Sequence, residues 1–191
     1  MSAFIKSGMQ KLERRIAFFT IRVIAVACLT APVFAQSVSP TLLTEENKQK
    51  IELAVWRYAI DTPLLVETID WFRDLTRNSQ ESAAIAELSR LKFMIAQLEM
   101  DKNRRVQLFE RCIAIADQAL ALNANDVRGL FWKAAAMGKM AEDSGIVNAF
   151  RMLRPMEKML LKVVALDEKY ENAGAHRALG RMYHKLPGFP I

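Results

Sequence analysis

Two short stretches decide the fold: Ala119-Leu120-Ala121-Leu122-Asn123 and, 44 positions later, Val163-Val164-Ala165-Leu166-Asp167. The similarity continues at the same offset on three positions of each unit, which are Trp132, Ala135 and Ala136 in the first and His176, Leu179 and Gly180 in the second. Each unit predicts a helix that ends in an apolar stretch, a polar turn and a second helix. Helical hairpins that cannot bury both faces alone stack on one another, so a repeat of this length indicates a solenoid.

The composition favours an all-α fold. The chain has 191 residues but only 7 Gly and 6 Pro, whereas sandwiches, barrels and nucleotide-binding α/β folds need many turns. Hydrophobic residues make up 52% of the chain, which is enough for a core and excludes intrinsic disorder. The spacing of apolar residues at three- and four-residue steps predicts a helical-hairpin solenoid of about seven helices between Thr44 and Lys185.

Residues 1–35 have the pattern of a secretory signal peptide. A basic segment runs to Arg22, and the stretch from Val23 to Ala35 is uncharged and mostly apolar. We expect cleavage after Ala35 and export to the periplasm or the cell exterior, with a flexible lead-in over residues 36–43, a helical domain over residues 44–191 and no membrane span in the mature form. Two alternatives stay open: an uncleaved membrane anchor, and a lipoprotein whose lipobox is Ala25-Val26-Ala27-Cys28, with acyl chains on Cys28.

Export would change the charge and thiol content of the protein. Removing residues 1–35 takes away five basic residues and one acidic residue out of 27 and 21, which leaves a net charge of about +2. The basic character of the whole chain therefore gives no support for nucleic-acid binding. Cys112 would be the only remaining thiol, and its apolar surroundings in the sequence predict a buried side chain.

The second unit resembles tetratricopeptide repeats through His176-x2-Leu179-Gly180-x2-Tyr183, and the first through Ala119-Leu120-x-Leu122-Asn123. Ala124 and Glu168 replace the usual closing Pro, and the period is 44 instead of 34. Longer, degenerate repeats of this kind are similar to the T component of bacterial TRAP transporters and, more distantly, to regulator-of-microtubule-dynamics-like proteins. The segments that carry this similarity are Leu88 to Leu91, Leu130 to Ala135, Tyr170 to Gly180 and Pro187-Gly188.

The resemblance to such solenoids implies a concave face lined by the first helix of each hairpin. We expect a partner or ligand to be bound there by Arg90, Trp132, Lys139, Asn172 and Arg177. Structural roles are expected for Ala136, Gly180 and Tyr183, with the small residues at the closest approach of neighbouring helices. Methionines at helical spacing, Met152, Met156 and Met159, are typical of a core and, in the transporter reading, would line an apolar ligand cavity.

Little in the sequence supports catalysis or metal binding. His176 and His184 are eight residues apart, about 12 Å along a helix, and cannot chelate one ion. Asp70 and Asp74 are accompanied by arginines, which favours a solvated charged face over an acid/base pair. The sequence has no Gly-rich phosphate loop, nucleophile elbow or HExxH motif. We therefore predict a protein that is not an enzyme, has no catalytic residue, no metal and no cofactor, and does not bind nucleic acid.

Two functions follow. The first is an exported, non-catalytic scaffold that binds a protein or peptide partner in its groove. The alternative is a TRAP-transporter accessory subunit that encloses a small apolar ligand and docks a periplasmic binding protein. The last helix has an apolar face but no partner helix after it, so we also predict that a C-terminal cap is missing, through fragmentation or because a second copy packs there as a homo-oligomer.

Overall fold

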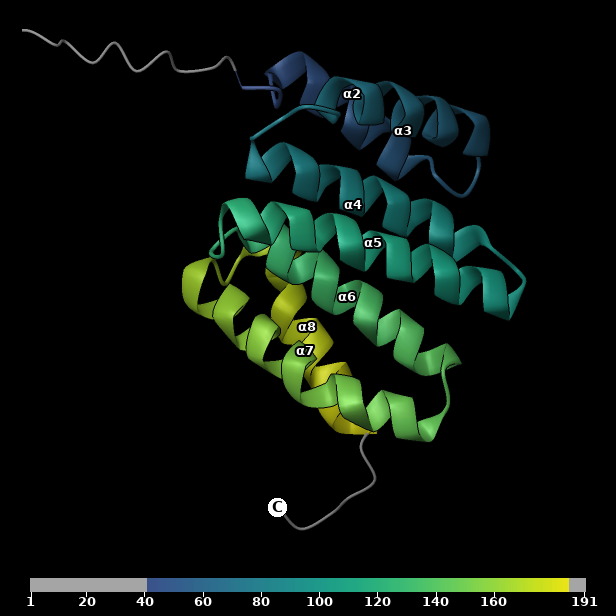
Figure 1. Ribbon diagram of the computed structural model, residues 1–191, viewed down its shortest axis with the longest axis vertical. Coiled ribbons are helices and arrows are strands. Elements are labelled where there is room, and N and C mark those ends of the chain that lie inside the picture. Colours follow the sequence, from purple (N-terminus) through teal and green to yellow (C-terminus); the bar gives the residue numbers. More distant parts are fainter. Residues whose placement is uncertain (1–40, 186–191) are drawn as a thin grey trace, which may run out of the picture. The chain divides into compact units, whose positions relative to one another are not determined.

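The computed structural model describes residues 41–185, and all secondary structure in this range is helical (Figure 1). The seven helices are α2 (Glu45–Trp56), α3 (Thr62–Thr76), α4 (Ser82–Leu98), α5 (Lys102–Leu122), α6 (Val127–Asp143), α7 (Ile146–Leu166) and α8 (Tyr170–Lys185). This confirms the predicted all-α fold of about seven helices. The predicted signal peptide, its cleavage site, the lipobox and most of the lead-in lie outside the described residues, as does the segment that follows α8.

Polar side chains set the starts of four helices. Thr44, Asp61, Asp101 and Asp126 each accept a hydrogen bond from the backbone N–H three residues further along the chain. Such caps satisfy one of the backbone N–H groups that the first turn of a helix leaves without a partner. The starts of these four helices are therefore determined by a capping residue next to each helix in the sequence.

The repeat is present in the helix boundaries. Helices α5 and α7 are both 21 residues long, and the second begins and ends 44 positions after the first. Each ends on the same cap, where the N–H of Asn123 donates to the carbonyl oxygen of Ala119 at 3.0 Å and the N–H of Asp167 donates to that of Val163 at 2.8 Å. Helices α5 and α7 thus occupy equivalent positions in the repeat.

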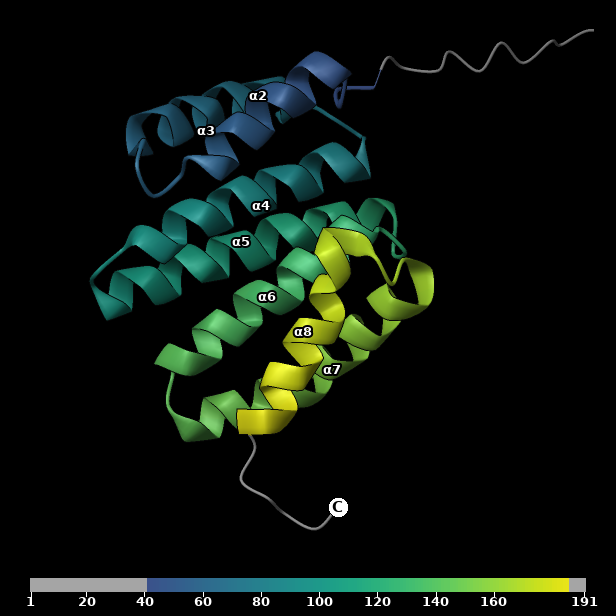
Figure 2. The ribbon, with the colours of Figure 1, turned by 180° about the vertical axis from the view of Figure 1, so that it is seen from behind.

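The hairpins pack side by side in chain order (Figures 1 and 2). Helix α4 lies at the centre, in contact with α2, α3, α5 and α6, and all its residues from 84 to 91 are buried. One apolar cluster joins α2, α3 and α4 around Phe72, and a second joins α4 through α8 around Phe109 and Leu160. Cys112 lies fully buried in the second cluster, as its sequence context predicts.

The prediction for Gly180 is wrong. A Cβ placed on Gly180 would meet nothing within 4 Å, and the residue is exposed. Ala136, its partner in the repeat, is fully buried because α4, α5, α7 and α8 surround α6, whereas α8 packs mainly against α6 and α7. The close approach is at Gly174 instead, where a Cβ would lie 2.8 Å from Cζ of Phe131.

Helix α8 begins with a left-handed turn. Glu171, Asn172 and Ala173 have φ angles of 49°, 54° and 57°, a conformation that costs an L-residue roughly 1–2 kcal/mol. The guanidinium of Arg177 donates to the backbone carbonyl oxygen of Glu171 at 2.8 Å and also to that of Asn172. These bonds hold the strained turn in place and fix where the right-handed part of α8 starts.

Candidate functional site

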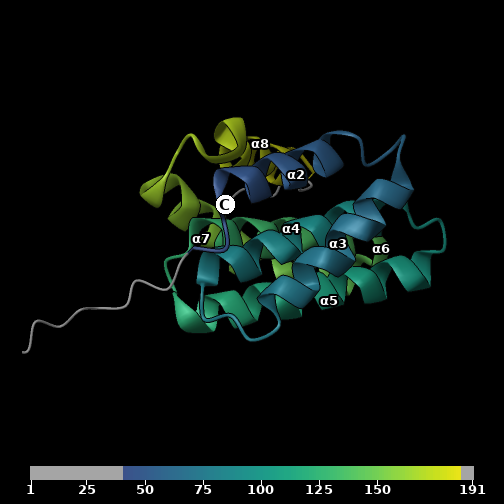
Figure 3. The ribbon, with the colours of Figure 1, turned by 90° about the horizontal axis from the view of Figure 1, so that it is seen from above.

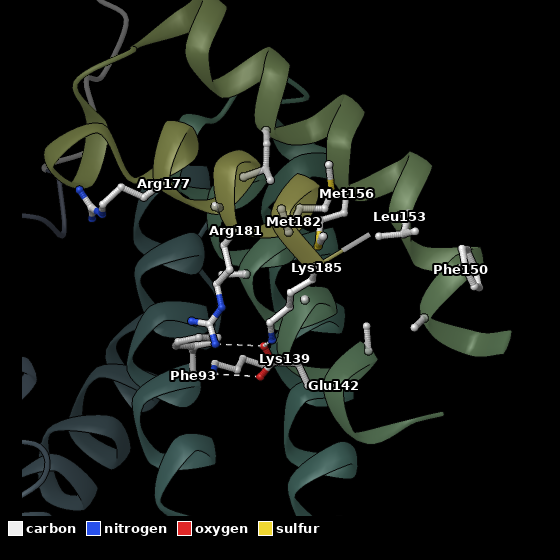
Figure 4. Close-up of a pocket in the computed structure, with 17 residues that line it drawn as sticks. Phe93, Lys139, Glu142, Phe150, Leu153, Met156, Arg177, Arg181, Met182 and Lys185 are labelled. Carbon is white, nitrogen blue, oxygen red and sulfur yellow. Dashed lines mark hydrogen bonds and ion pairs between the residues drawn. The ribbon is translucent and has the colours of Figure 1, made fainter. Parts of the chain in front are cut away.

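A cavity of about 550 Å³ lies between α6, α7 and α8. Its apolar wall includes Leu153, Met156 and Leu160 from α7 and Met182 from α8, and Phe93 of α4 adds an aromatic ring (Figure 4). Binding pockets for small molecules have this size and this predominance of apolar side chains. The cavity is the candidate ligand site of the protein.

The cavity exists because α6 presents small residues to it. Its lining from α6 includes Ala134, Ala135, Gly138 and Ala141. Because positions three and four apart share one face of a helix, this face leaves space where larger side chains would fill the gap between α6 and its neighbours. Outside the backbone of α6 and the two neighbours of Gly138 in the chain, a Cβ built on Gly138 would have one described atom within 4 Å, the sulfur of Met156 at 3.2 Å.

Charged side chains gather at one side of the cavity. Glu142 accepts hydrogen bonds from Nζ of Lys185 at 2.6 Å and Nη2 of Arg181 at 3.2 Å on one oxygen, and from Nζ of Lys139 at 3.2 Å on the other. Partial burial works to raise the pKa of the Glu142 carboxyl, but the hydrogen bonds from Lys185 and Lys139 outweigh it and hold the pKa below its usual value. Glu142 is therefore an anion that gathers three cations around it.

A second charged cluster lies among the helices around Arg90 of α4. Its guanidinium Nη1 donates to Glu87 at 2.8 Å and Nη2 donates to Glu52 of α2 at 3.0 Å, while Nε lies 3.4 Å from the carboxylate of Glu171. Burial works to lower the pKa of Arg90, but its hydrogen bonds to Glu52 and Glu87 raise it, so the side chain stays charged. Arg90 ties α2 and the start of α8 to α4, and Figure 3 shows α2 and α8 on one side of the stack.

Trp132 belongs to the same cluster. Its ring lies 5.8 Å from the guanidinium carbon of Arg90, and its Nε1–H donates to the hydroxyl oxygen of Tyr170 at 3.1 Å. The exposed fractions of Arg90 and Trp132 are only 7% and 5%. The sequence predicted both side chains on an open groove, but neither lies on one.

The five predicted binding residues therefore do not share one site, because Arg90 and Trp132 are buried away from the cavity. Lys139 and Arg177 line the cavity, although Arg177 points away from Glu142 (Figure 4) and bonds to the backbone at Asn172. Asn172 itself is exposed. The roles of these residues in binding stay predictions.

Sequence reasoning missed Arg181, Lys185 and Glu142. A signal for the cations was present, because Arg177, Arg181 and Lys185 recur every four residues and must share one face of a helix. Tyr183, which was given a structural role, is about half exposed and donates its hydroxyl to Glu157 of α7 at 2.5 Å. Among residues 41–185, no group of three or more His, Cys, Asp or Glu side chains could hold a metal ion.

The helices and the cavity define an all-α protein of stacked helical hairpins. The chain belongs to the family of TRAP transporter T-components, whose model matches residues 90–189. This range includes every residue that lines the cavity. No curated protein matches the chain. The family match confirms the resemblance to the T component, while the resemblances to tetratricopeptide repeats and to regulator-of-microtubule-dynamics-like proteins stay predictions. Within residues 41–185, no helix has the length and apolar character needed to cross a membrane.

Proposed function

We propose that the protein is a non-catalytic accessory subunit of a TRAP transporter, and that it holds a small apolar ligand in the cavity between α6, α7 and α8. The observation that carries this proposal is the position of the cavity inside the part of the chain that matches the family. The sequence alone ranked an interaction scaffold first and the transport accessory second. The family match and the apolar cavity reverse that order.

Two methionines support an apolar ligand, and one of them, Met156, belongs to the group at helical spacing described in the sequence analysis. Met156 and Met182 both line the cavity and are 8% and 7% exposed. The flexible, polarisable side chain of Met adapts to ligands of different shape. The cavity can therefore adjust around an apolar ligand without repacking the helices.

The ligand proposal is tested by native mass spectrometry and lipid extraction of the purified protein. We expect a small apolar molecule to co-purify with it. Ala135→Leu places a larger side chain in the cavity and should abolish co-purification, whereas Ala114→Leu adds the same atoms on an exposed position of α5 and should not. A protein that carries no ligand and binds no neutral apolar fluorophore would refute the proposal.

We further propose that the mature protein is exported and docks the periplasmic substrate-binding protein of the same transporter. The signal-like pattern of residues 1–35 and the family match support this. The mass of the mature chain distinguishes its forms, because cleavage after Ala35, acylation at Cys28 and an intact N-terminus give different values. Isothermal titration with the purified binding protein tests the docking, and the absence of measurable binding with or without ligand would contradict it.

A further inference from the structure

The charged side of the cavity bears on the chemistry of its ligand. Figure 4 shows the side chains of Lys139, Arg181 and Lys185 converging on Glu142, while Leu153 and Met156 lie on the opposite side of the cavity. A molecule that fills the space between these walls would meet apolar atoms at one end and cations at the other. Such a polarised site suits an amphiphile better than a uniformly apolar molecule.

The balance of charge at this end favours an anion. Three cations face one carboxylate, so the group carries a net charge of about +2. An ammonium has three N–H donors and a guanidinium has five, whereas each of these cations gives Glu142 one hydrogen bond among the described residues. The cations therefore retain donors for a second anion beside Glu142.

The cations are also open to a ligand. The side chains of Arg181, Lys185 and Lys139 are 61%, 53% and 33% exposed. Ion pairs in such positions are screened by water and contribute little to the stability of the fold. An anionic head group that enters the cavity would displace that water and strengthen the attraction.

We infer that the ligand is a single-chain amphiphile with an apolar tail and an anionic head group, the tail between α6 and α7 and the head at Arg181, Lys185 and Lys139. The inference rests on the proposed function, because it names the class of ligand for the same cavity. A neutral head group would gain nothing from the excess positive charge, and a cationic one would be repelled by it.

The test uses the full chain after ligand removal, with the neutral fluorophore N-phenylnaphthylamine in the cavity. Decanoate, decanol and decylammonium share one tail and differ in head-group charge, and decyl phosphate distinguishes a phosphate from a carboxylate head. We expect decanoate or decyl phosphate to displace the fluorophore about tenfold more tightly than decanol, and decylammonium to be weakest. Equal displacement by decanoate, decyl phosphate and decanol would overturn the anionic head group but leave the proposed function standing. Failure of the fluorophore itself to bind would count against the proposed function.

Substitutions identify the residues that hold the head group. Arg181→Met and Lys185→Met should each weaken decanoate binding about two- to fivefold and leave decanol unchanged. Lys158→Met removes a cation from an exposed position of α7 outside the cavity and serves as the charge-matched control. An effect of Lys158→Met equal to that of Arg181→Met would show that only overall charge matters and would overturn the inference.

Glu142→Gln changes the charge in the opposite direction. Among residues 41–185 it removes the only carboxylate that lines the cavity, so decanoate should bind more tightly and decylammonium still more weakly. Because this variant predicts a gain, misfolding cannot imitate the expected result. Weaker decanoate binding in a variant with an unchanged circular dichroism spectrum would overturn the inference.

Discussion

Two glycines on α8 give the sharpest test of the packing. Gly174 and Gly180 both lie on this helix, but a Cβ would lie 2.8 Å from the ring of Phe131 at Gly174 and would meet nothing within 4 Å at Gly180. Replacing Gly with Ala inside a helix contributes up to about 1 kcal/mol of stability. Gly180→Ala should therefore stabilise the protein, with a rise in melting temperature of about 2–4 °C per kcal/mol.

Gly174→Ala should destabilise the protein, because its methyl group would clash with the ring of Phe131. The ring of Phe131 is 8% exposed and packs edge-on against Trp132 and Tyr170 at centroid distances of 5.0 and 5.4 Å, so it cannot swing away freely. Forcing a methyl group into a packed core costs about 1–3 kcal/mol. Gly174 directly follows the left-handed turn and should gain less in helix propensity than Gly180 in the helix interior. The free energies of unfolding of the two variants should therefore differ by at least the cost of the contact with Phe131, about 1–3 kcal/mol.

Urea unfolding followed by circular dichroism measures both variants against the parent protein. The control is the Phe131→Leu background, in which the ring is absent and the cost of Gly174→Ala should largely disappear. This double-mutant cycle separates the contact from other effects of the methyl group. Equal changes in stability for Gly174→Ala and Gly180→Ala would refute the assigned helix contact.

Three further outcomes follow from buried or strained groups. Arg90→Met removes the hydrogen-bonded cation from the buried carboxylate of Glu87 and leaves it only the longer contact with Arg128 at 3.7 Å, so the free energy of unfolding at neutral pH should fall by about 3 kcal/mol. Burial raises the pKa of Glu87 above its usual value, and the loss of Arg90 should raise it further; the cost should therefore shrink as the pH falls through the pKa of Glu87 in the variant, and a cost that is constant with pH in urea unfolding would contradict this. Burial raises the pKa of Cys112 to about 12, so in a Cys28→Ser background a thiol reagent should label Cys112 only after unfolding, and rapid labelling of the native protein would count against its burial. Ala173→Gly relieves a left-handed φ of 57° and should stabilise the protein by up to about 1 kcal/mol in the same unfolding assay. An Ala→Gly substitution at a right-handed helical position would instead lower the stability, so a loss at Ala173 would contradict the left-handed turn.

The sequence predicted the helices well because their boundaries depend on local signals. Thr44, Asp61 and Asp101 cap helices where the sequence places a capping residue before an apolar periodic segment. The ends of α5 and α7 follow from the repeated apolar stretch. None of these features needs knowledge of a distant residue.

The cavity could be predicted only in part because its walls come from four helices. Lys139 and Arg177 line it, as their positions on the first helices of two hairpins suggested. Phe93 and Glu142 were missed, because their places depend on how α4, α6 and α8 cross in space. Arg90 and Trp132 were expected on a surface but lie inside, since α2 and the start of α8 cover them through Glu52 and Glu171.

The contrast between Ala136 and Gly180 explains what a sequence repeat can and cannot establish. The two positions are equivalent by the 44-residue period, and this equivalence correctly gives the order and length of the helices. Burial, however, depends on the helices that lie beside a position, and in the described residues α6 has neighbours on more sides than α8. The smaller number of neighbours around α8 also produces the charged side of the cavity. The face of α8 that carries Arg181 and Lys185 faces Glu142 of α6, and no further hairpin within residues 41–185 covers it. The repeat therefore builds the scaffold, and the departure from it at α8 gives the cavity its charged side.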